Sequence, residues 1–491
     1  MHNLDASKTS EDTGLHFLVS TGPGKPDPAL RKFIRSYVML GKNRGKTLLR
    51  RKRRSDDVSS MSFSGSATSS RHNNELVQVY MPPSNQNHGI YPVKIPQKLG
   101  SDLSSIHLAD GLEPGKIEIV LQFSRIAKQV LFPLEICMFF EKRAENWIAP
   151  LSFDPAYLHA IIFTSQYYFD AVRLRQFSTT NRSALPHLVK ALVLLRQRFA
   201  SDEDQYKLSN STAAAIMGLA GYSHLTGDLK SAKHHLDGLR RIVSLRGGVA
   251  SFRSNAKLLI EILRCDISLA LHCGSRPIFF NVSTEDESSP PFPDLKLLKR
   301  PRPTTTRFQQ KIIVPLDNMD IRLAQIWKVM EDFCSVIDFA VSSELRISTE
   351  TFLDTMAAVV YRLLGMRIDP CSTNEAIRLG LLALSCSVFL YNRNLGISYP
   401  HLKCTLRSFL LGPVPLELDH QFLLWLLMVG YMSVVDAADD EWMRPLLLGA
   451  LGSCNLDSWS MTQEVLKQFL WIDLVHSKPG KHMFDSIMHH V

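Results

Sequence analysis

The chain has 491 residues, of which 45% are hydrophobic and 21% charged, a globular composition with a length that suits about three domains. Its net charge of +9 comes from one segment, because residues 25–54 hold twelve Lys and Arg against a single acid, Asp27. That segment carries +11 and the rest of the chain −2, which excludes a body that binds nucleic acid through a broad excess of charge. The pattern predicts a basic arm attached to a nearly neutral globule.

Residues 1–54 are polar and then basic, and we expect them to form a disordered arm. Its principal cations are Lys42, Arg44, Lys46, Arg50, Arg51, Lys52, Arg53 and Arg54. Such a run fits the groove of a nuclear-import receptor, or DNA phosphates contacted with release of counterions. Three interpretations stay open: a nuclear localisation signal, a non-specific phosphate contact that can coexist with it, and a merely solvated tail.

The arm also contains GKNRGKT at residues 41–47, which partly resembles a phosphate-binding P-loop. A P-loop has four residues between its glycines, so that successive backbone N–H groups surround the phosphates, and this segment has three. The basic run follows it directly. A solvated basic arm is therefore the favoured interpretation of this segment.

The next 61 residues, 55–115, are assigned to a linker rich in Ser, Pro and Gly. From residue 116 onward apolar residues recur at helical spacing, as in the stripe formed by Leu188, Leu192, Leu195 and Phe199. Six prolines mark residues 281–316 as an irregular connection between two helical halves, 116–280 and 317–491. The sequence predicts an all-α fold, a multi-helix array of antiparallel helix pairs preceded by a disordered basic and Ser-rich N-terminal region.

Three local signals refine this expectation. Pro186 suits the first turn of a helix, and the pair Gly247 and Gly248 should end the helix that reaches Arg246. The longest apolar run, Phe422 to Val435, has fourteen residues, too few to cross a hydrocarbon layer of ~30 Å, and predicts a buried core helix. The first thirty residues lack the pattern of a secretory signal, so we expect a soluble protein.

Eight cysteines are scattered along the chain without any CxxC pair. Structural zinc sites almost always use such a close pair, so a zinc finger, ribbon or binuclear zinc cluster is not expected. The cysteines are interpreted as reduced core residues of an intracellular protein.

Three groups of polar residues were weighed as sites, and each has a structural interpretation that is favoured. The acidic stretch DAADDE at 436–441 lacks the order of the DDxxD-type magnesium motif of all-α terpene synthases, and predicts a charged helix end. His234 and His235 have no ligand partners at suitable spacing and predict a helix surface. Cys265 and Cys273 share a helical face only loosely, which favours core packing over a redox or metal cluster with Asp266 and His272. No catalytic residues, metal or cofactor are expected, and the chain is not predicted to be an enzyme.

The stretch HLDGLRRIVSLRGGVASF at 235–252, followed by a helix with an aspartate, resembles the regulatory domain of fungal-specific transcription factors. Further segments that agree with this resemblance begin at residues 154, 183, 374, 422 and 465. Upstream, RKFIRSYVMLGKNRGK at 31–46 resembles a basic N-terminal motif of a subgroup of this family, with Tyr37 in place of the usual His. The residues that carry the regulatory-domain motif are Arg240, Arg241, Arg246, Gly247, Gly248 and Asp266. Where buried, the arginines need acidic or carbonyl partners, and Asp266 is a candidate.

Members of this family typically read DNA with a six-cysteine binuclear zinc cluster, whereas this chain has no cysteine before Cys137. The resemblance therefore implies a nuclear transcription regulator whose contact with DNA is indirect or non-specific. Expected partners are a nuclear-import receptor and the transcription machinery or another regulator, with no membrane. A helical interaction module that does not bind DNA, corepressor-like or a degenerate paralogue, is the alternative, and an all-α enzyme is a remote third.

Overall fold

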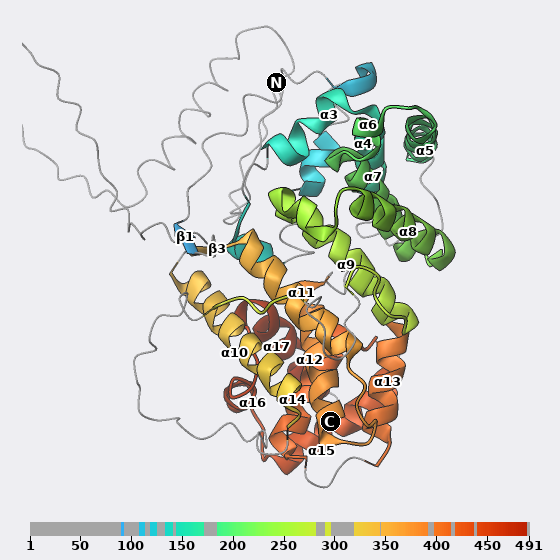
Figure 1. The fold of residues 1–491 in the computed structure, drawn as a ribbon. Helices are drawn as coiled ribbons and strands as arrows, with labels where there is room; N and C mark the ends of the chain where they lie inside the picture. The colour runs from blue at the N-terminus through green and yellow to red at the C-terminus, as the bar shows by residue number, and fades with distance from the viewer. Residues whose placement is uncertain are drawn as a thin grey trace, which may run out of the picture. The chain divides into compact units, whose positions relative to one another are not determined.

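The computed structural model describes residues 90–92, 108–112, 118–124, 133–140, 144–170, 184–280, 290–295, 319–343, 345–390, 397–413, 418–436 and 439–488. All of them belong to one compact unit, residues 82–491. The basic arm, most of the Ser-rich linker and most of the Pro-rich connection lie outside the described residues. Within the described residues helices dominate and strands are few and short, which confirms the predicted all-α class (Figure 1).

Helices before the Pro-rich connection are α3 (Pro150–Phe153), α4 (Pro155–Tyr168), α5 (Leu185–Ala200), α6 (Asp204–Lys207), α7 (Asn210–Leu225), α8 (Leu229–Leu245) and α9 (Ala256–Cys273). Those after it are α10 (Ile321–Ser342), α11 (Thr349–Gly365), α12 (Thr373–Phe389), α13 (Pro400–Leu411), α14 (His420–Ser433), α15 (Asp440–Ser453), α16 (Trp459–Leu466) and α17 (Asp473–Met488). Helices α4 and α5, α7 and α8, and α12 and α14 pack as pairs.

Short polar side chains begin several of these helices. The side chain of Ser209 accepts a hydrogen bond from the backbone of Thr212 and so caps α7, and Ser348 caps α11 in the same way. Pro186 lies in the first turn of α5, as predicted. Helix α8 ends just before Gly247 and Gly248, whose φ angles of 91° and 99° favour glycine, which confirms the predicted stop.

A small sheet accompanies the helices. Its central strand, β3 (Leu345–Ser348), pairs antiparallel with β1 (Ile90–Pro92) and parallel with β2 (Met138–Phe139). Strand β3 leads directly into α11. The sheet therefore brings residues 138–140 next to the start of α11, a placement that bears on the site described below.

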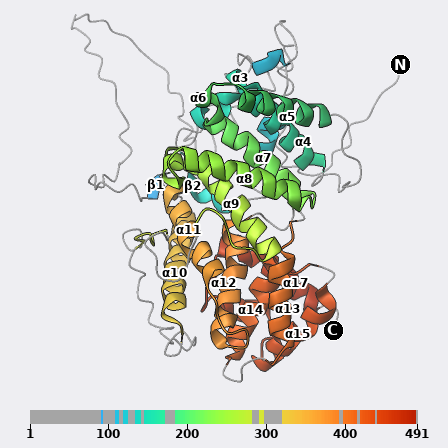
Figure 2. The same cartoon turned by 45° about the vertical axis from the view of Figure 1, so that its right-hand side comes forward.

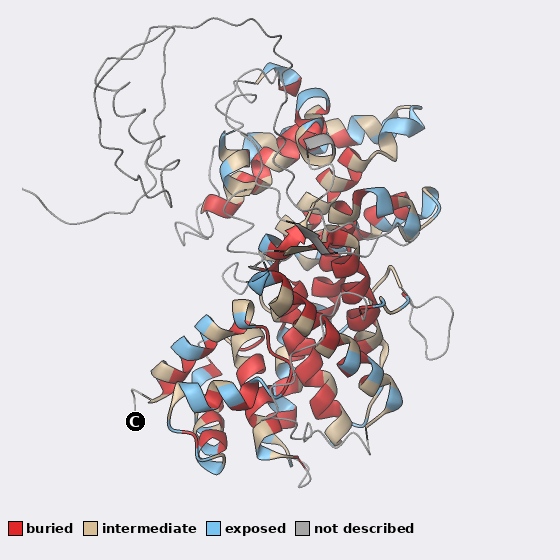
Figure 3. Cartoon of the chain, turned by 90° about the vertical axis from the view of Figure 1, so that its left-hand side faces the viewer, coloured by how far each residue is buried: buried red, intermediate tan, exposed pale blue. Residues whose placement is uncertain are grey.

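Helix α9 lies at the centre of the helical packing. It contacts α7 and α8 on one side and α11 and α13 on the other (Figures 1 and 2). One hydrophobic cluster contains buried residues from both sides of the Pro-rich connection. Figure 3 shows buried residues in the interior of both groups of helices. The two predicted halves therefore share this large cluster, and a second, smaller cluster includes Leu151 and Ile162.

Two sequence predictions about apolar stretches have different outcomes. Helix α14 is buried from Leu424 to Gly430, which confirms a core helix, and among the described residues no helix is long and apolar enough to cross a membrane. Helix α5 also forms, but it buries Ala191 and Leu195, whereas Leu192 and Phe199 of the predicted apolar stripe are 39% and 45% exposed. The contact face of α5 is rotated toward the small residue Ala191, which lets α5 pack closely on α4.

Candidate functional site

The cations predicted to act in nuclear import or phosphate contact, Lys42 to Arg54, lie outside the described residues. The regulatory-domain motif is placed, and it occupies the C-terminal part of α8, the turn that follows and the middle of α9. Its members have different surroundings.

Arg246 joins three segments at the end of α8. Its guanidinium donates to the Leu208 carbonyl at 3.2 Å, to Asn210 Oδ1 at 2.7 Å and to the Ser251 carbonyl at 3.2 Å. The same group lies 3.8 Å from the centre of the Phe252 ring, a buried aromatic. Arg246 thus holds the turn after Gly247 and Gly248 against the start of α7, which meets the predicted need for a carbonyl partner.

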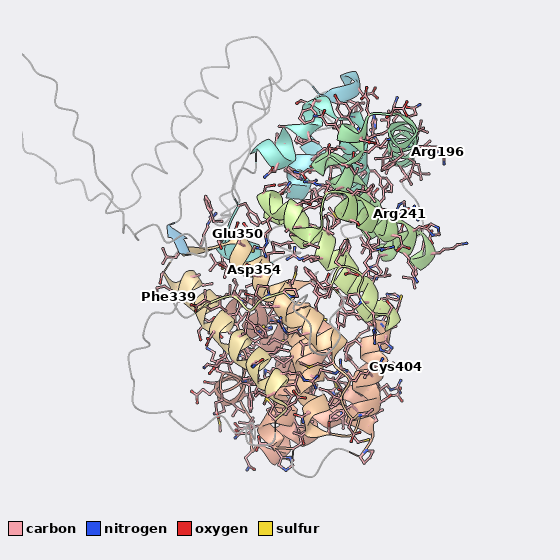
Figure 4. All side chains as sticks on the ribbon, viewed as in Figure 1. Arg196, Arg241, Phe339, Glu350, Asp354 and Cys404 are labelled. Atoms are coloured by element: carbon pink, nitrogen blue, oxygen red, sulfur yellow. The ribbon has the colours of Figure 1, made fainter. Side chains whose placement is uncertain are left out.

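Arg240 and Arg241 lie on the exposed face of α8, and Arg241 points away from the helices in Figure 4. Arg240 Nε lies 4.0 Å from Asp237 Oδ1 on the same helix. The prediction that Asp266 partners the motif arginines is therefore wrong. The buried face of α8 consists of apolar side chains such as Leu239, and this face excludes the arginines from α9.

Asp266 is instead the acceptor for the chain that follows α9. Its carboxylate, 1% exposed, accepts hydrogen bonds from the backbone N–H groups of Ile278 and Phe279, at 2.9 and 3.1 Å, and from the Tyr361 hydroxyl at 2.8 Å. Burial raises the pKa of this carboxyl to about 6, against the opposing effect of the three donors. Asp266 thereby ties the segment after α9 to α11.

A cavity of about 340 Å³ lies beside this motif, with walls from α4, α7, α8 and α9. Residues 139–140 and the first residues of α11 also contribute to its lining. Aromatic and aliphatic side chains form most of the wall, including Phe140, Trp147 and Met217. Concave, mainly apolar cavities of this size are the usual form of a small-molecule site.

Aromatic rings line the part of the cavity between α4 and α7. Tyr222 makes edge-to-face contacts with Phe163 and Tyr167, with ring centres 4.6 and 4.7 Å apart. Burial raises the pKa of both tyrosines, so their hydroxyls stay protonated at neutral pH. Close by on α7, His224 lies 3.2 Å from the His272 ring, and burial lowers its pKa to about 4, which keeps it neutral.

Charged side chains appear at the opposite edge, where α9 and α11 begin. Arg253 donates to Asp354 at 2.8 Å, and Lys257 lies 2.6 Å from Glu261. The lining contains two cations, Arg253 and Lys257, and two anions, Glu261 and Glu350. Glu350 and Asp354 lie on the first turns of α11 (Figure 4). The formal charge of the lining residues that the structure describes is therefore zero.

Residues 121–294 match the family model of the fungal specific transcription factor domain. This segment is similar to a fungal-specific transcription factor domain. The match spans α3 to α9, which include the motif and most of the cavity wall. No curated protein and no solved structure matches the chain.

The acidic stretch at 436–441 forms ion pairs and a hydrogen bond within the fold. Asp436 and Asp439 of the acidic stretch both lie within 3.1 Å of Lys403, and Asp440 accepts from Tyr431. Among the described residues, no group of three His, Cys, Asp or Glu side chains is arranged to hold a metal ion.

The cysteine prediction holds only in part. All eight cysteines are free thiols, and Cys137, Cys265, Cys334 and Cys386 are buried as expected. Cys273, Cys371 and Cys404 are exposed, which corrects the assignment of all eight to the core. Of the predicted surface histidines, His234 is exposed and His235 is half-buried.

Sequence reasoning did not find the cavity of the transcription factor domain. Its lining combines α4, α7 and α9 with residues 348–350 and Ile397, which are far apart along the chain. The available signals were local and unspecific: the aromatic run at 167–169 and the small residues of α7, among them Gly218 and Gly221. Neither of them predicts an empty space.

Proposed function

We propose that this chain is a nuclear transcription regulator without enzymatic activity, in which the helical domain performs regulation and the basic arm directs import. The observation that carries the proposal is the match of residues 121–294 to a fungal-specific transcription factor domain, together with the all-helical fold. Its partners would be a nuclear-import receptor and the transcription machinery or another regulator.

Contact with DNA is proposed to be indirect or non-specific. The chain has no cysteine before Cys137, so the N-terminal region offers no ligands for a binuclear zinc cluster. The twelve cations of residues 25–54 supply attraction to phosphates but no pattern of donors for base edges. Binding through such an arm falls steeply with salt, because each phosphate contact releases counterions.

Localisation of a fluorescent fusion of the full chain tests the import step. Replacing Arg50 to Arg54 with alanine should move the protein from the nucleus to the whole cell. A matched control replaces exposed cations of the helical domain, Arg240 and Arg241 among them, and should leave the protein nuclear. Unchanged nuclear accumulation of the arm variant would overturn the assignment of that run.

Fluorescence anisotropy with duplex DNA tests the contact to phosphates. The full chain should bind unrelated duplexes with similar affinity, lose about tenfold or more between 50 and 200 mM salt, and lose binding with the arm variant. Preference for one sequence would show that the chain reads bases itself. Absence of binding at low salt would favour the interaction module that does not contact DNA.

A further inference from the structure

We propose that the cavity between α4, α7 and α9 is a binding site for a small, uncharged and largely apolar molecule that carries a hydrogen-bonding oxygen. The binding step depends only on the cavity. Its consequence for transcription rests on the proposed function, and the experiments below keep the two apart.

The size and the walls of the cavity favour an apolar ligand. A volume of about 340 Å³ lies at the lower end of the range for drug-sized molecules. Apolar cavities stay poorly hydrated, so a molecule that fills one does not have to displace strongly bound water. Side chains such as Phe140, Trp147 and Leu236 offer dispersion contacts on several sides.

The charges of the described lining residues argue against an anionic ligand. Each cation is already paired, Arg253 with Asp354 and Lys257 with Glu261. His224 is neutral at physiological pH and so supplies no positive charge either. An anion bound here would lose its hydration without gaining an unpaired cation among the described lining residues, which is costly in an apolar environment.

Two tyrosines supply the polar contact. The hydroxyls of Tyr167 and Tyr222 make no hydrogen bond to another described residue, although both residues line the cavity. Because their raised pKa values keep them as phenols, each can donate to a carbonyl or hydroxyl oxygen. The same rings present edges and faces to a ring system, which favours a cyclic ligand.

The cavity also joins parts of the fold that can respond to a ligand. Asn255 caps α9 through a hydrogen bond from Leu258, and both residues contribute to the lining. Thr349 and Glu350, in the first turn of α11, line the same space. A molecule in contact with the first turns of both helices is able to favour one relative position of α9 and α11 over another.

Binding is measured on the purified full chain with phenylnaphthylamine, an uncharged probe whose fluorescence rises in apolar surroundings. Anilinonaphthalene sulfonate, with the same ring skeleton and a negative charge, serves as the comparison probe. The wild-type chain should bind the uncharged probe saturably and about tenfold or more tightly than the sulfonate. Equal or tighter binding of the sulfonate, or no saturable binding of the uncharged probe, overturns the proposal.

The variant Gly221→Leu fills the cavity. Gly221 lines it, and a Cβ added there has no heavy atom within 4 Å. Gly238 on α8 has equally open surroundings but lies outside the lining, so Gly238→Leu is the matched control. Leucine favours a helix over glycine at both positions, and both variants should therefore fold.

Gly221→Leu should weaken phenylnaphthylamine binding by about tenfold or more, whereas Gly238→Leu should leave it unchanged. The probe should also raise the Tm of the wild type and of Gly238→Leu but not of Gly221→Leu. Wild-type binding by a folded Gly221→Leu variant, checked by circular dichroism, would place the site elsewhere. None of these readouts requires nuclear import, so their failure leaves the proposed function intact. Failure of the localisation or DNA-binding tests likewise leaves the proposed ligand site intact.

A double variant, Tyr167→Phe with Tyr222→Phe, tests the polar contact. It should weaken binding of naphthol by about threefold to tenfold, the value of one hydrogen bond, and leave binding of naphthalene unchanged. Equal effects on the two probes, or no effect on naphthol, would refute the role of the tyrosine hydroxyls.

Discussion

Asp266 should make the stability of the protein rise as the pH is lowered from 7.5 to 5. Burial raises the pKa of this carboxyl from 3.8 to about 6 in the folded protein, while in the unfolded chain it keeps its ordinary value. Between pH 3.8 and 6 the folded state therefore binds more protons than the unfolded state. Protonation then favours folding, so the free energy of unfolding falls as pH rises through 6.

The magnitude follows from the two pKa values. At pH 7.5 the carboxyl is ionised in both states and contributes nothing to the pH dependence. At pH 5 the folded state is mostly protonated and the unfolded state mostly ionised, which stabilises the protein by about 1.4 kcal/mol relative to pH 7.5. An amide has no titration in this range, so Asp266→Asn should abolish this contribution.

Urea unfolding followed by circular dichroism at several pH values measures the effect. Other groups titrate in the same range, and so the informative quantity is the difference in unfolding free energy between wild type and Asp266→Asn. This difference should change by about 1.4 kcal/mol between pH 7.5 and 5, in favour of the wild type at low pH. A difference that is independent of pH would refute the raised pKa.

Tyr361→Phe provides a second test at the same site. The Tyr361 hydroxyl donates to the ionised Asp266 at 2.8 Å and lowers the pKa of its carboxyl. Without this donor the pKa should rise further, so the pH at which stability begins to increase should move above 6. The variant should also lose about 1.5–3 kcal/mol at pH 7.5, because a hydrogen bond to a charged group is removed. A shift of the Asp266 pKa to a lower value in Tyr361→Phe would contradict the hydrogen bond between these two residues.

Three further predictions concern the motif and the C-terminal helices. Gly248→Ala should destabilise the protein by about 1–3 kcal/mol in urea unfolding, because its φ of 99° is strained for alanine, whereas Gly238→Ala within α8 should stabilise it by about 0.5–1 kcal/mol. Arg246→Met should lower the free energy of unfolding by about 2–3 kcal/mol, because its hydrogen bonds are lost. Arg241 is exposed, so Arg241→Met should change the free energy of unfolding by no more than about 0.5 kcal/mol. Burial lowers the pKa of His476 to about 3, so the stabilisation from its neutral form is complete above pH 6.5 and is lost as the pH falls toward 3. His476→Gln should therefore make the free energy of unfolding depend less on pH in the acid range.

Much of the fold was predictable because its signals are local. Pro186 at the start of α5 and the glycines after α8 act through the backbone angles of single residues, and both predictions are confirmed. The burial of α14 follows from its uninterrupted apolar composition, which leaves no polar face for water. Such features need no knowledge of the tertiary packing.

The face that a helix buries depends on its neighbours. In α5 the close approach to α4 selects Ala191, so Phe199 remains 45% exposed despite lying on the apolar stripe. The hydrogen-bond partners of Asp266 likewise depend on the tertiary packing. It bonds to two backbone N–H groups twelve and thirteen residues further on and to a tyrosine 95 residues away, and backbone donors carry no residue-type signal.

The regulatory motif and the cavity are physically connected, although the sequence presents them as separate features. Arg246 holds the Ser251 carbonyl and lies over Phe252, which fixes the turn that follows α8. The next residues, 253–256, line the cavity, and Asn255 among them caps α9. The glycines permit the sharp reversal that directs this turn back toward α9. The motif therefore shapes one edge of the proposed ligand site, and the half-buried Arg246 positions that edge.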